Sequence, residues 1–166
     1  MTLHAFTDGA SRGNPGESGI GILVKDDEGN VVLSLNGFIG NSTNNRAEYI
    51  ALTTLLERMQ GSSCRRLVVH SDSELMVRQV NGQYKVKDQA MKRYHRRVTG
   101  LVAGSPFAFE LKHIPRELNR EADRLANQAI DERTTLEPQT GPPPRHSGGG
   151  MTDRSGAGIP SDSRSA

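Results

Sequence analysis

Two periodicities of hydrophobic and polar residues run through the first 133 positions of the chain. Alternation with a period of two, or a short continuous apolar run, predicts strands at residues 3–7, 19–26, 30–38, 66–72 and 107–113. Apolar residues spaced three and four apart predict helices at residues 44–59, 74–81, 87–102 and 119–130. Three strands come first, and helices then alternate with strands. This order predicts an α/β fold in which helices pack on a mixed sheet.

Residues 134–166 differ in composition from the rest of the chain. Of these 33 residues, 5 are proline, 6 are glycine and 5 are serine, and large apolar side chains are scarce. Such a segment buries too little apolar surface to offset the entropy cost of ordering it. We therefore expect one folded domain at residues 1–133 and a disordered tail at residues 134–166. A linker to another domain and a partner-binding segment are alternative interpretations of the tail.

Charge and cysteine content narrow the class of protein only a little. The formal net charge of +2 is mildly basic. The single cysteine, Cys64, excludes an internal disulfide and a cysteine-based zinc site, and it fits a reducing, cytoplasmic compartment. No apolar stretch reaches about 18 residues, so we expect no membrane span. No basic and then apolar leader precedes the first strand, so we expect no secretory signal, and we take a monomer as the default.

Four acidic residues occupy the ends of predicted elements. Asp8 and Asp72 end strands, Glu48 lies in the first turn of a predicted helix and Asp123 lies near the start of another, where the apolar face of each helix begins. Ligand sites in open sheets favour strand ends, so we expect the four to converge at one edge of the sheet. Converging carboxylates repel one another and stay ionised only when cations neutralise them. An all-oxygen cluster suits Mg²⁺ or Mn²⁺, and a pair of such ions serves in-line displacement at phosphorus.

Each acid also has an ordinary structural interpretation when it is taken alone. Asp8 can simply end a strand, and Asp72 can cap the helix that follows it. Glu48 can stabilise a helix dipole, and Asp123 can be a solvated helix residue. The strings that surround the four residues decide between the two interpretations.

Those strings resemble the four motifs of the type 1 ribonucleases H. TDGASRGNPG is similar to the first motif, TNNRAE to the second, HSDS to the third and LNREADRLAN to the fourth. The motifs occur in the family order and span residues 3–130. The resemblance implies a ribonuclease H-like fold: a five-stranded mixed sheet, with three antiparallel and two parallel strands, flanked by helices.

The resemblance also implies an activity. Members of the family are endonucleases that hydrolyse the RNA strand of an RNA–DNA hybrid with two Mg²⁺ ions, for which Mn²⁺ can substitute, and leave 5′-phosphate and 3′-hydroxyl ends. By the family pattern, Asp8 bridges both ions and Glu48 also positions the RNA. The implied catalytic metal ligands are Asp8, Glu48, Asp72 and Asp123.

An enzyme that distinguishes RNA from DNA must recognise the 2′-hydroxyl group. Glycines around the first motif allow close approach to a sugar–phosphate chain, and a helix start near Thr43 can hold a phosphate. A plain turn at Asn14 and a helix cap at Asn44 are alternatives that can hold together with binding, and we expect Asn119 to cap the last helix and to face the metal site. The predicted substrate-binding residues are Gly9, Ser11, Asn14, Thr43, Asn44, Asn45 and Asn119.

A basic stretch lies between the third and fourth motifs. Concentrated positive charge is typical of a surface that binds a phosphate backbone, whereas a solvated helix face is the alternative. We expect Tyr84 and Tyr94 to pack in the core rather than stack on bases. Residues 78–97 include Arg78, Lys85, Lys87, Lys92, Arg93, Arg96 and Arg97, against the single acid Asp88.

Two features depart from the family pattern. Some members carry an extra basic helix and loop with tryptophans before the fourth motif, but this chain has no tryptophan and little room there, so we expect a short form. The family also has a flexible-loop histidine that assists product release. His113 is its nearest counterpart, but we expect it on a strand end, and Arg116 or Glu117 is the alternative occupant of that place.

Two other functions compete with a hybrid nuclease. Another nuclease on the same fold, such as a junction resolvase or transposase core, is disfavoured because GNPG and TNNRAE serve 2′-hydroxyl recognition in the family. An inactive hybrid-binding module is disfavoured because all four acids are retained. Activity on double-stranded RNA is an additional hypothesis, since a short form lacks part of the surface that grips DNA.

Overall fold

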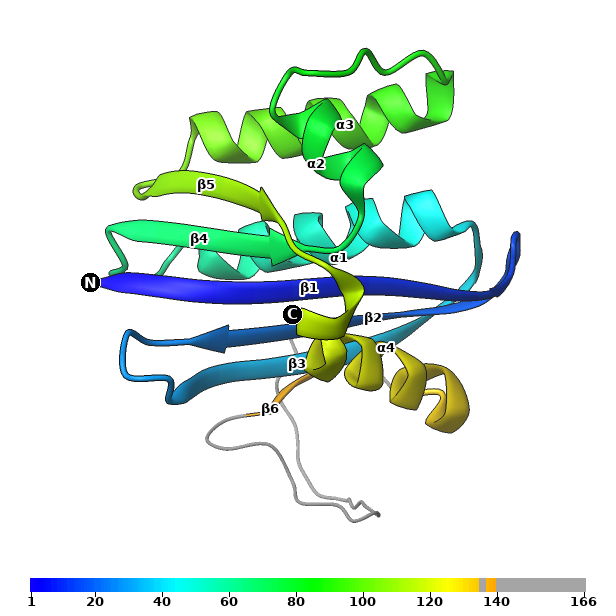
Figure 1. Ribbon diagram of the computed structural model, residues 1–166, viewed down its shortest axis with the longest axis horizontal. Helices are drawn as coiled ribbons and strands as arrows, with labels where there is room; N and C mark the ends of the chain where they lie inside the picture. The colour runs from blue at the N-terminus through cyan, green and yellow to red at the C-terminus, as the bar shows by residue number, and fades with distance from the viewer. Residues whose placement is uncertain (135–136, 140–166) are drawn as a thin grey trace.

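A single sheet with the strand order β5-β4-β1-β2-β3-β6 forms the centre of the molecule (Figure 1). The computed structural model describes residues 1–134 and 137–139. Its strands are β1 (Thr2–Gly13), β2 (Gly16–Lys25), β3 (Val31–Ser42), β4 (Arg66–Ser71), β5 (Ala108–His113) and β6 (Glu137–Gln139). Its helices are α1 (Asn44–Met59), α2 (Glu74–Val80), α3 (Gln89–Ala103) and α4 (Arg120–Glu132), with a 3₁₀ turn η1 (Arg116–Leu118) before α4.

The directions of the strands confirm the expected fold class. β1, β2 and β3 are antiparallel neighbours, and β4 and β5 run parallel to β1. The continuous apolar run in β4 fits its central place, because a parallel strand covered on both faces has no solvent-exposed side. The ends of the four helices differ from the predicted ones by only one or two residues.

Helices bury both faces of the central strands. α1 packs on β1 and β2, with α3 against it, while α4 covers the opposite face across β1, β2 and β3 (Figure 1). Ile22, Leu35, Leu52 and Leu55 are among the fully buried side chains of the core that contains α1. Because helices cover both faces of the central strands, a cluster of polar residues has room only beyond the end of a strand. β4 ends in this way beside β1.

The prediction that Asp8 ends a strand is wrong. Asp8 lies in the middle of β1, where it pairs with Gly21 of β2, and β1 continues to Gly13. The parallel pairing with β4 does end there, at the pair Thr7 and Ser71. The glycine-rich string after Asp8 looks like a turn in the sequence, but it continues β1 because residues of β2 pair with it. Asp8 is therefore the first β1 residue beyond the end of β4.

The segment predicted as a disordered tail lies largely outside the described residues. Its short described part contains β6, which pairs antiparallel with residues 34–36 of β3 and was not expected. Phe38 also donates its backbone N–H to the Thr134 carbonyl at 2.8 Å. The boundary at residue 133 and the tail at 134–166 stay predictions.

Gly21 provides a test of how tightly α4 is packed. A Cβ atom at Gly21 would lie 2.2 Å from the Ala122 carbonyl oxygen and 2.9 Å from the Leu125 Cβ. We expect Gly21→Ala to lower the free energy of unfolding by about 1–3 kcal/mol, because α4 has to move. Gly100→Ala is the matched control, since it lies in α3 with open space around it and should raise stability by about 0.5–1 kcal/mol. Urea unfolding measures both, and equal effects of the two changes would contradict the packing.

Candidate active site

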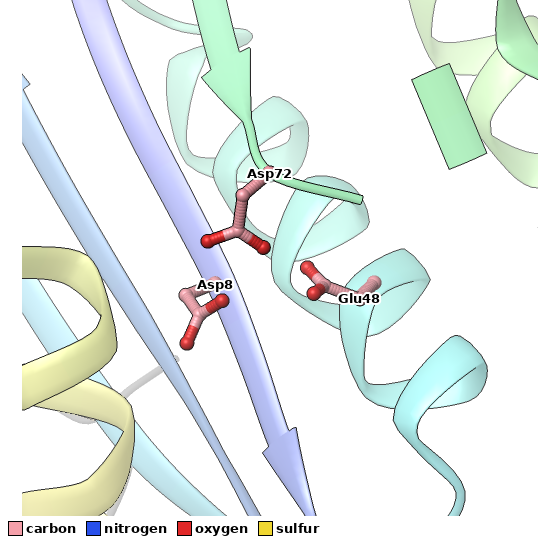
Figure 2. A group of neighbouring side chains, drawn as sticks. All are labelled: Asp8, Glu48 and Asp72. Carbon is pink, nitrogen blue, oxygen red and sulfur yellow. The ribbon is translucent and has the colours of Figure 1, made fainter. Parts of the chain in front are cut away.

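Three of the four predicted acids meet beyond the end of β4. One carboxylate oxygen from each of Asp8, Glu48 and Asp72 lies within 4.8 Å of the other two. Figure 2 shows Asp8 on β1, Glu48 on α1 and Asp72 just after β4, with their carboxylates directed into one space. Asp8 and Glu48 are buried, and Asp72 is half-buried. The predicted convergence is therefore confirmed for these three residues.

Asp123 approaches the trio from the opposite helix layer. Asp8 and Gly21 are cross-strand partners, so both direct their Cβ positions to the face that α4 covers. Asp123 lies in the first turn of α4, and its side chain is close enough to hydrogen-bond with that of Asp8. Asp123 does not join the tighter group of three. The structure thus brings all four acids to one region, with Asp8 between the trio and Asp123.

Gly9 positions Glu48. A Cβ atom at Gly9 would lie 2.2 Å from the backbone carbon of Ala47 and 2.4 Å from the backbone nitrogen of Glu48, so only glycine lets α1 come this close to β1. The Gly9 N–H also donates to Glu48 Oε1 at 3.2 Å. The sequence suggested that Gly9 opens space for substrate, but here it opens space for α1. Glu48 lies in the second turn of α1, one turn later than predicted.

Asn119 holds Asp72 and does not serve as a side-chain helix cap. Its Nδ2 donates to the Thr7 carbonyl at 2.9 Å and to Asp72 Oδ2 at 3.1 Å, and its side chain makes no capping bond to α4. Asn119 is 1% exposed, so it is closed off from a substrate in this structure. Asn119 therefore occupies the cap position of α4, as predicted, but its side chain binds Asp72 and a β1 carbonyl and makes no hydrogen bond to an α4 N–H.

Burial and repulsion between like charges raise the pKa values of two of the acids. The pKa of Asp8 is raised from 3.8 to about 8, first by burial and then by the charges of Asp72 and Asp123 and a hydrogen bond with Asp123. Burial and the charges of Asp8 and Asp72 also raise the pKa of Glu48 well above its usual value. The Gly9 N–H opposes the shift of the Glu48 pKa and the charge of Arg116 opposes both shifts, in each case only in part.

The residues fit a divalent metal ion. The donor set consists of carboxylate oxygens, which Mg²⁺ and Mn²⁺ prefer. Within residues 1–134, no lysine or arginine forms an ion pair with any of the four acids. Buried carboxylates without a paired cation are unfavourable unless an ion neutralises them or they take up protons. The chemistry of the cluster therefore suits an added divalent cation.

The predicted substrate-binding residues group around the β1–β2 hairpin and the start of α1. Asn14 Oδ1 accepts the backbone N–H of Asn44 at 3.1 Å, which ties the tip of the hairpin to the helix. Ser11 Oγ donates to the Ser42 carbonyl at 2.9 Å. Thr43, not Asn44, caps α1, because its Oγ1 accepts the Arg46 N–H at 3.2 Å. Asn14, Asn44 and Asn45 are exposed, so this ridge remains open to a ligand.

The three auxiliary candidates lie in and after β5. His113 is the last residue of β5, as expected, and its side chain is exposed. Arg116 and Glu117 are exposed in η1. Of the three, Arg116 alone acts on the pKa of both Asp8 and Glu48, so its charge is the one that reaches the carboxylates.

The basic stretch forms a surface on α3 and on the loop that joins it to α2. Residues 81–88 make this connection without a helix, so the protrusion that some ribonucleases H carry has no counterpart in the described chain. Arg78 and Arg97 are neutralised by Glu74 and Glu57, at 2.9 and 2.7 Å. The other five, which make no ion pair within residues 1–134, form what we call the basic surface: Lys85, Lys87, Lys92, Arg93 and Arg96.

A groove of about 420 Å³ runs through the basic surface. Tyr84, Lys85, Lys92 and Arg96 are among the residues that line it. The expectation that Tyr84 packs in the core is wrong, since it is 49% exposed with the Arg78 guanidinium over its ring. Tyr94, by contrast, does pack against Tyr49 in the core.

Sequence reasoning missed Arg12 and Asn127. Asn127 Nδ2 donates to Asp123 Oδ1 at 3.2 Å, and Arg12 contacts Asn127 from β1. The spacing of four residues between Asp123 and Asn127 on one helix was the available signal for their contact. Arg12 and Asn127 are 115 residues apart in the sequence, so no local pattern indicated their contact.

No helix within the described residues combines the length and the hydropathy that a membrane span needs.

The sequence matches one described protein family and several individual proteins. Residues 6–129 match the family described as reverse transcriptase-like. The chain is 36% identical over 130 residues to ribonuclease HI of Halobacterium salinarum, which covers 78% of this chain and 65% of that protein. It is 37% identical over 133 residues to a bifunctional protein of Mycobacterium tuberculosis, which covers 79% of this chain and 36% of that protein. The chain thus spans less than two thirds of either relative.

A solved structure supports the same relationship. The crystal structure of LC11-RNase H1 in complex with an RNA/DNA hybrid superposes with a TM-score of 0.75 at 40% identity, and covers 78% of this chain and 97% of that chain. The family match spans more than half of this chain and includes all four acids. With the sheet topology and the short link between α2 and α3, these matches show that the chain belongs to the type 1 ribonuclease H family, as a short form without the basic protrusion.

Proposed function

We propose that this chain is a metal-dependent endonuclease that hydrolyses the RNA strand of RNA–DNA hybrids. The observation that carries the proposal is the convergence of three buried or half-buried carboxylates that lack a cationic partner within residues 1–134. The relationship to LC11-RNase H1, which was solved with an RNA/DNA hybrid, supports the choice of substrate. The ribonuclease HI of H. salinarum supports the choice of reaction.

We assign Asp8, Glu48, Asp72 and Asp123 as ligands of two Mg²⁺ ions, for which Mn²⁺ can substitute. The four carboxylates would hold the metal, and Asp8, which lies between Asp123 and the other two acids, would join the two parts of the cluster. When bound, such a pair supplies an activated water and neutralises the leaving oxygen, which yields 5′-phosphate and 3′-hydroxyl ends. The Gly9 N–H holds Glu48, and Asn119 holds Asp72, so the carboxylates are oriented before any ion arrives.

We assign RNA recognition to the ridge formed by the hairpin tip and the start of α1. Exposed amides of Asn14, Asn44 and Asn45 can accept from and donate to a 2′-hydroxyl group. The Asn14 contact with Asn44 makes the two halves of the ridge one unit, which fixes their spacing.

We assign the opposite DNA strand to the basic surface. Lysine and arginine side chains without acidic partners displace the counterions condensed on nucleic acid when they contact its phosphates, so this contact contributes affinity that falls with salt. This surface would take the place of the absent protrusion. A monomer in the cytoplasm is consistent with this activity and is part of the proposal.

A cleavage assay tests the metal site. We expect Asp8→Asn to lower the rate of hybrid cleavage by more than about 100-fold, because loss of a group that only orients a ligand already costs 10–100-fold. Asp27→Asn is the matched control, since Asp27 is exposed in the β2–β3 turn and pairs with His4 at 2.9 Å. Labelled RNA in a hybrid is incubated with Mg²⁺ or with EDTA. Cleavage that persists in EDTA or in Asp8→Asn would contradict the proposal.

The stability of the metal-free protein should fall as the pH rises. The folded state binds the Asp8 proton more tightly than the unfolded state does, because the folded pKa is about 8 and the usual value is 3.8. Between these two values the folded state holds the extra proton, so each pH unit removes up to about 1.4 kcal/mol of unfolding free energy.

Urea unfolding in EDTA at several pH values measures this slope. We expect Asp8→Asn to show a shallower slope and to exceed the wild type in stability near the upper end, since it removes the group that must ionise there. Mg²⁺ should restore wild-type stability at high pH by binding the folded state only. Parallel slopes for the two proteins would show that Asp8 is not the titrating group.

Substrate discrimination follows from the exposed ridge. We expect cleavage of the RNA in a hybrid, slower cleavage of double-stranded RNA and no cleavage of double-stranded DNA, which has no 2′-hydroxyl group. A time course on the three labelled duplexes ranks the rates. Complete resistance of double-stranded RNA would remove the hypothesis of a second activity, and cleavage of double-stranded DNA would remove 2′-hydroxyl recognition itself.

A further inference from the structure

A chain of hydrogen bonds connects the β1–β2 hairpin with Asp123. Arg12, near the end of β1, donates from Nη1 to Asp131 Oδ1 at 2.6 Å. Its Nη2 donates to Asn127 Oδ1 at 3.2 Å and to the Asn127 carbonyl at 3.3 Å. Asn127 Nδ2 in turn donates to Asp123 Oδ1 at 3.2 Å and to the Asp123 carbonyl at 3.0 Å. The hairpin that carries Ser11 and Asn14 is thus joined to the fourth acid.

Arg12 determines which way the amide of Asn127 points. A guanidinium group has only donors, so it must face the amide oxygen. The amide nitrogen is then left to face the carboxylate of Asp123, which can only accept when ionised. A side-chain pair spaced by four residues on a helix is common and by itself carries little meaning. The contact from β1 is what gives this pair a single orientation.

Asp123 needs such a restraint. The other acids are held by the scaffold: Glu48 by the Gly9 N–H, and Asp72 by the buried amide of Asn119. Asp123 is half-buried in the first turn of α4, outside the group of three, with the repelling carboxylate of Asp8 beside it. Once Asp8 is ionised, as a metal ligand must be, repulsion would rotate a free aspartate side chain away from it. The amide of Asn127 occupies one of its oxygens and opposes that rotation.

We propose that Asn127 is a positioning residue that keeps the carboxylate of Asp123 directed at the metal site, and that Arg12 keeps Asn127 in the orientation required. The inference rests on the proposed function, because it assigns Asp123 as a metal ligand. Neither Asn127 nor Arg12 has to contact an ion or the reacting phosphate. Their effect is on metal affinity through Asp123.

Metal binding in the absence of substrate tests the inference. Free Mn²⁺ is measured by electron paramagnetic resonance during titration of the full chain, and far-UV circular dichroism checks the fold. We expect Asn127→Ala to weaken Mn²⁺ binding by about 10-fold, as loss of a group that orients a ligand typically does. Gln128→Ala is the matched control, because Gln128 is the next residue on α4 and its amide contacts Glu132 instead, at 3.4 Å. The control should bind Mn²⁺ as the wild type does.

Two further variants separate positioning from general damage to the fold. Arg12→Ala removes a side chain that is 45% exposed, and we expect a smaller loss of Mn²⁺ affinity in the same direction. Asn127→Ala combined with Asp123→Asn should bind Mn²⁺ as Asp123→Asn alone does, because the effect passes through that carboxylate. An added loss in the combined variant, or wild-type affinity in both Asn127→Ala and Arg12→Ala, would overturn the inference.

The inference and the proposed function fail in different ways. If the wild type binds Mn²⁺ and cleaves the hybrid while Asn127→Ala binds Mn²⁺ equally well, only the positioning role is lost. If the wild type neither binds Mn²⁺ nor cleaves the hybrid, the proposed function is lost, and the positioning role is lost with it.

Discussion

Repulsion among buried carboxylates is the constraint on which the rest of this structure depends. Three acids have oxygens within 4.8 Å of one another, and a fourth touches Asp8. Burial first, and then the charges of neighbouring acids, raise the pKa of Asp8 to about 8 and that of Glu48 well above its usual value. A fold holds such a cluster only if packing elsewhere exceeds the repulsion, or if cations and protons relieve it. Metal binding and protein stability therefore both depend on how the repulsion among these carboxylates is relieved.

The packing that opposes this repulsion depends on two glycines. Gly9 lets the backbone of α1 lie against β1, and Gly21 lets α4 lie against β2 on the other face. Glu48 arrives with the first helix and Asp123 with the second, so the distance between the helix layers also sets the distance between the acids. Asp8 lies on β1 between them. A substitution that weakens the packing of either helix would therefore move the acids of the site without replacing any of them.

Much of the fold and the identity of the acids could be predicted from the sequence, because periodicity and motif strings are local. Both ends of α1 follow directly from the apolar spacing, and those of α4 do so to within two residues. The continuation of β1 beyond Asp8 could not be predicted, since it depends on the β2 residues that pair with it. Asn119 is at the predicted cap position of α4, but its amide donates to Asp72 and to a β1 carbonyl that only the tertiary structure brings near. Arg12 and Asn127 were missed for the same reason.

The number of protons released when Mn²⁺ binds is the most direct test of this account. Calorimetric titration near neutral pH, repeated in buffers with different heats of ionisation, counts those protons. The account predicts release of about one proton or more per protein, because Asp8 has a pKa of about 8 without metal and must be ionised to act as a ligand. Binding without proton release would mean that the carboxylates are already ionised, and that their mutual repulsion is not what the cation relieves.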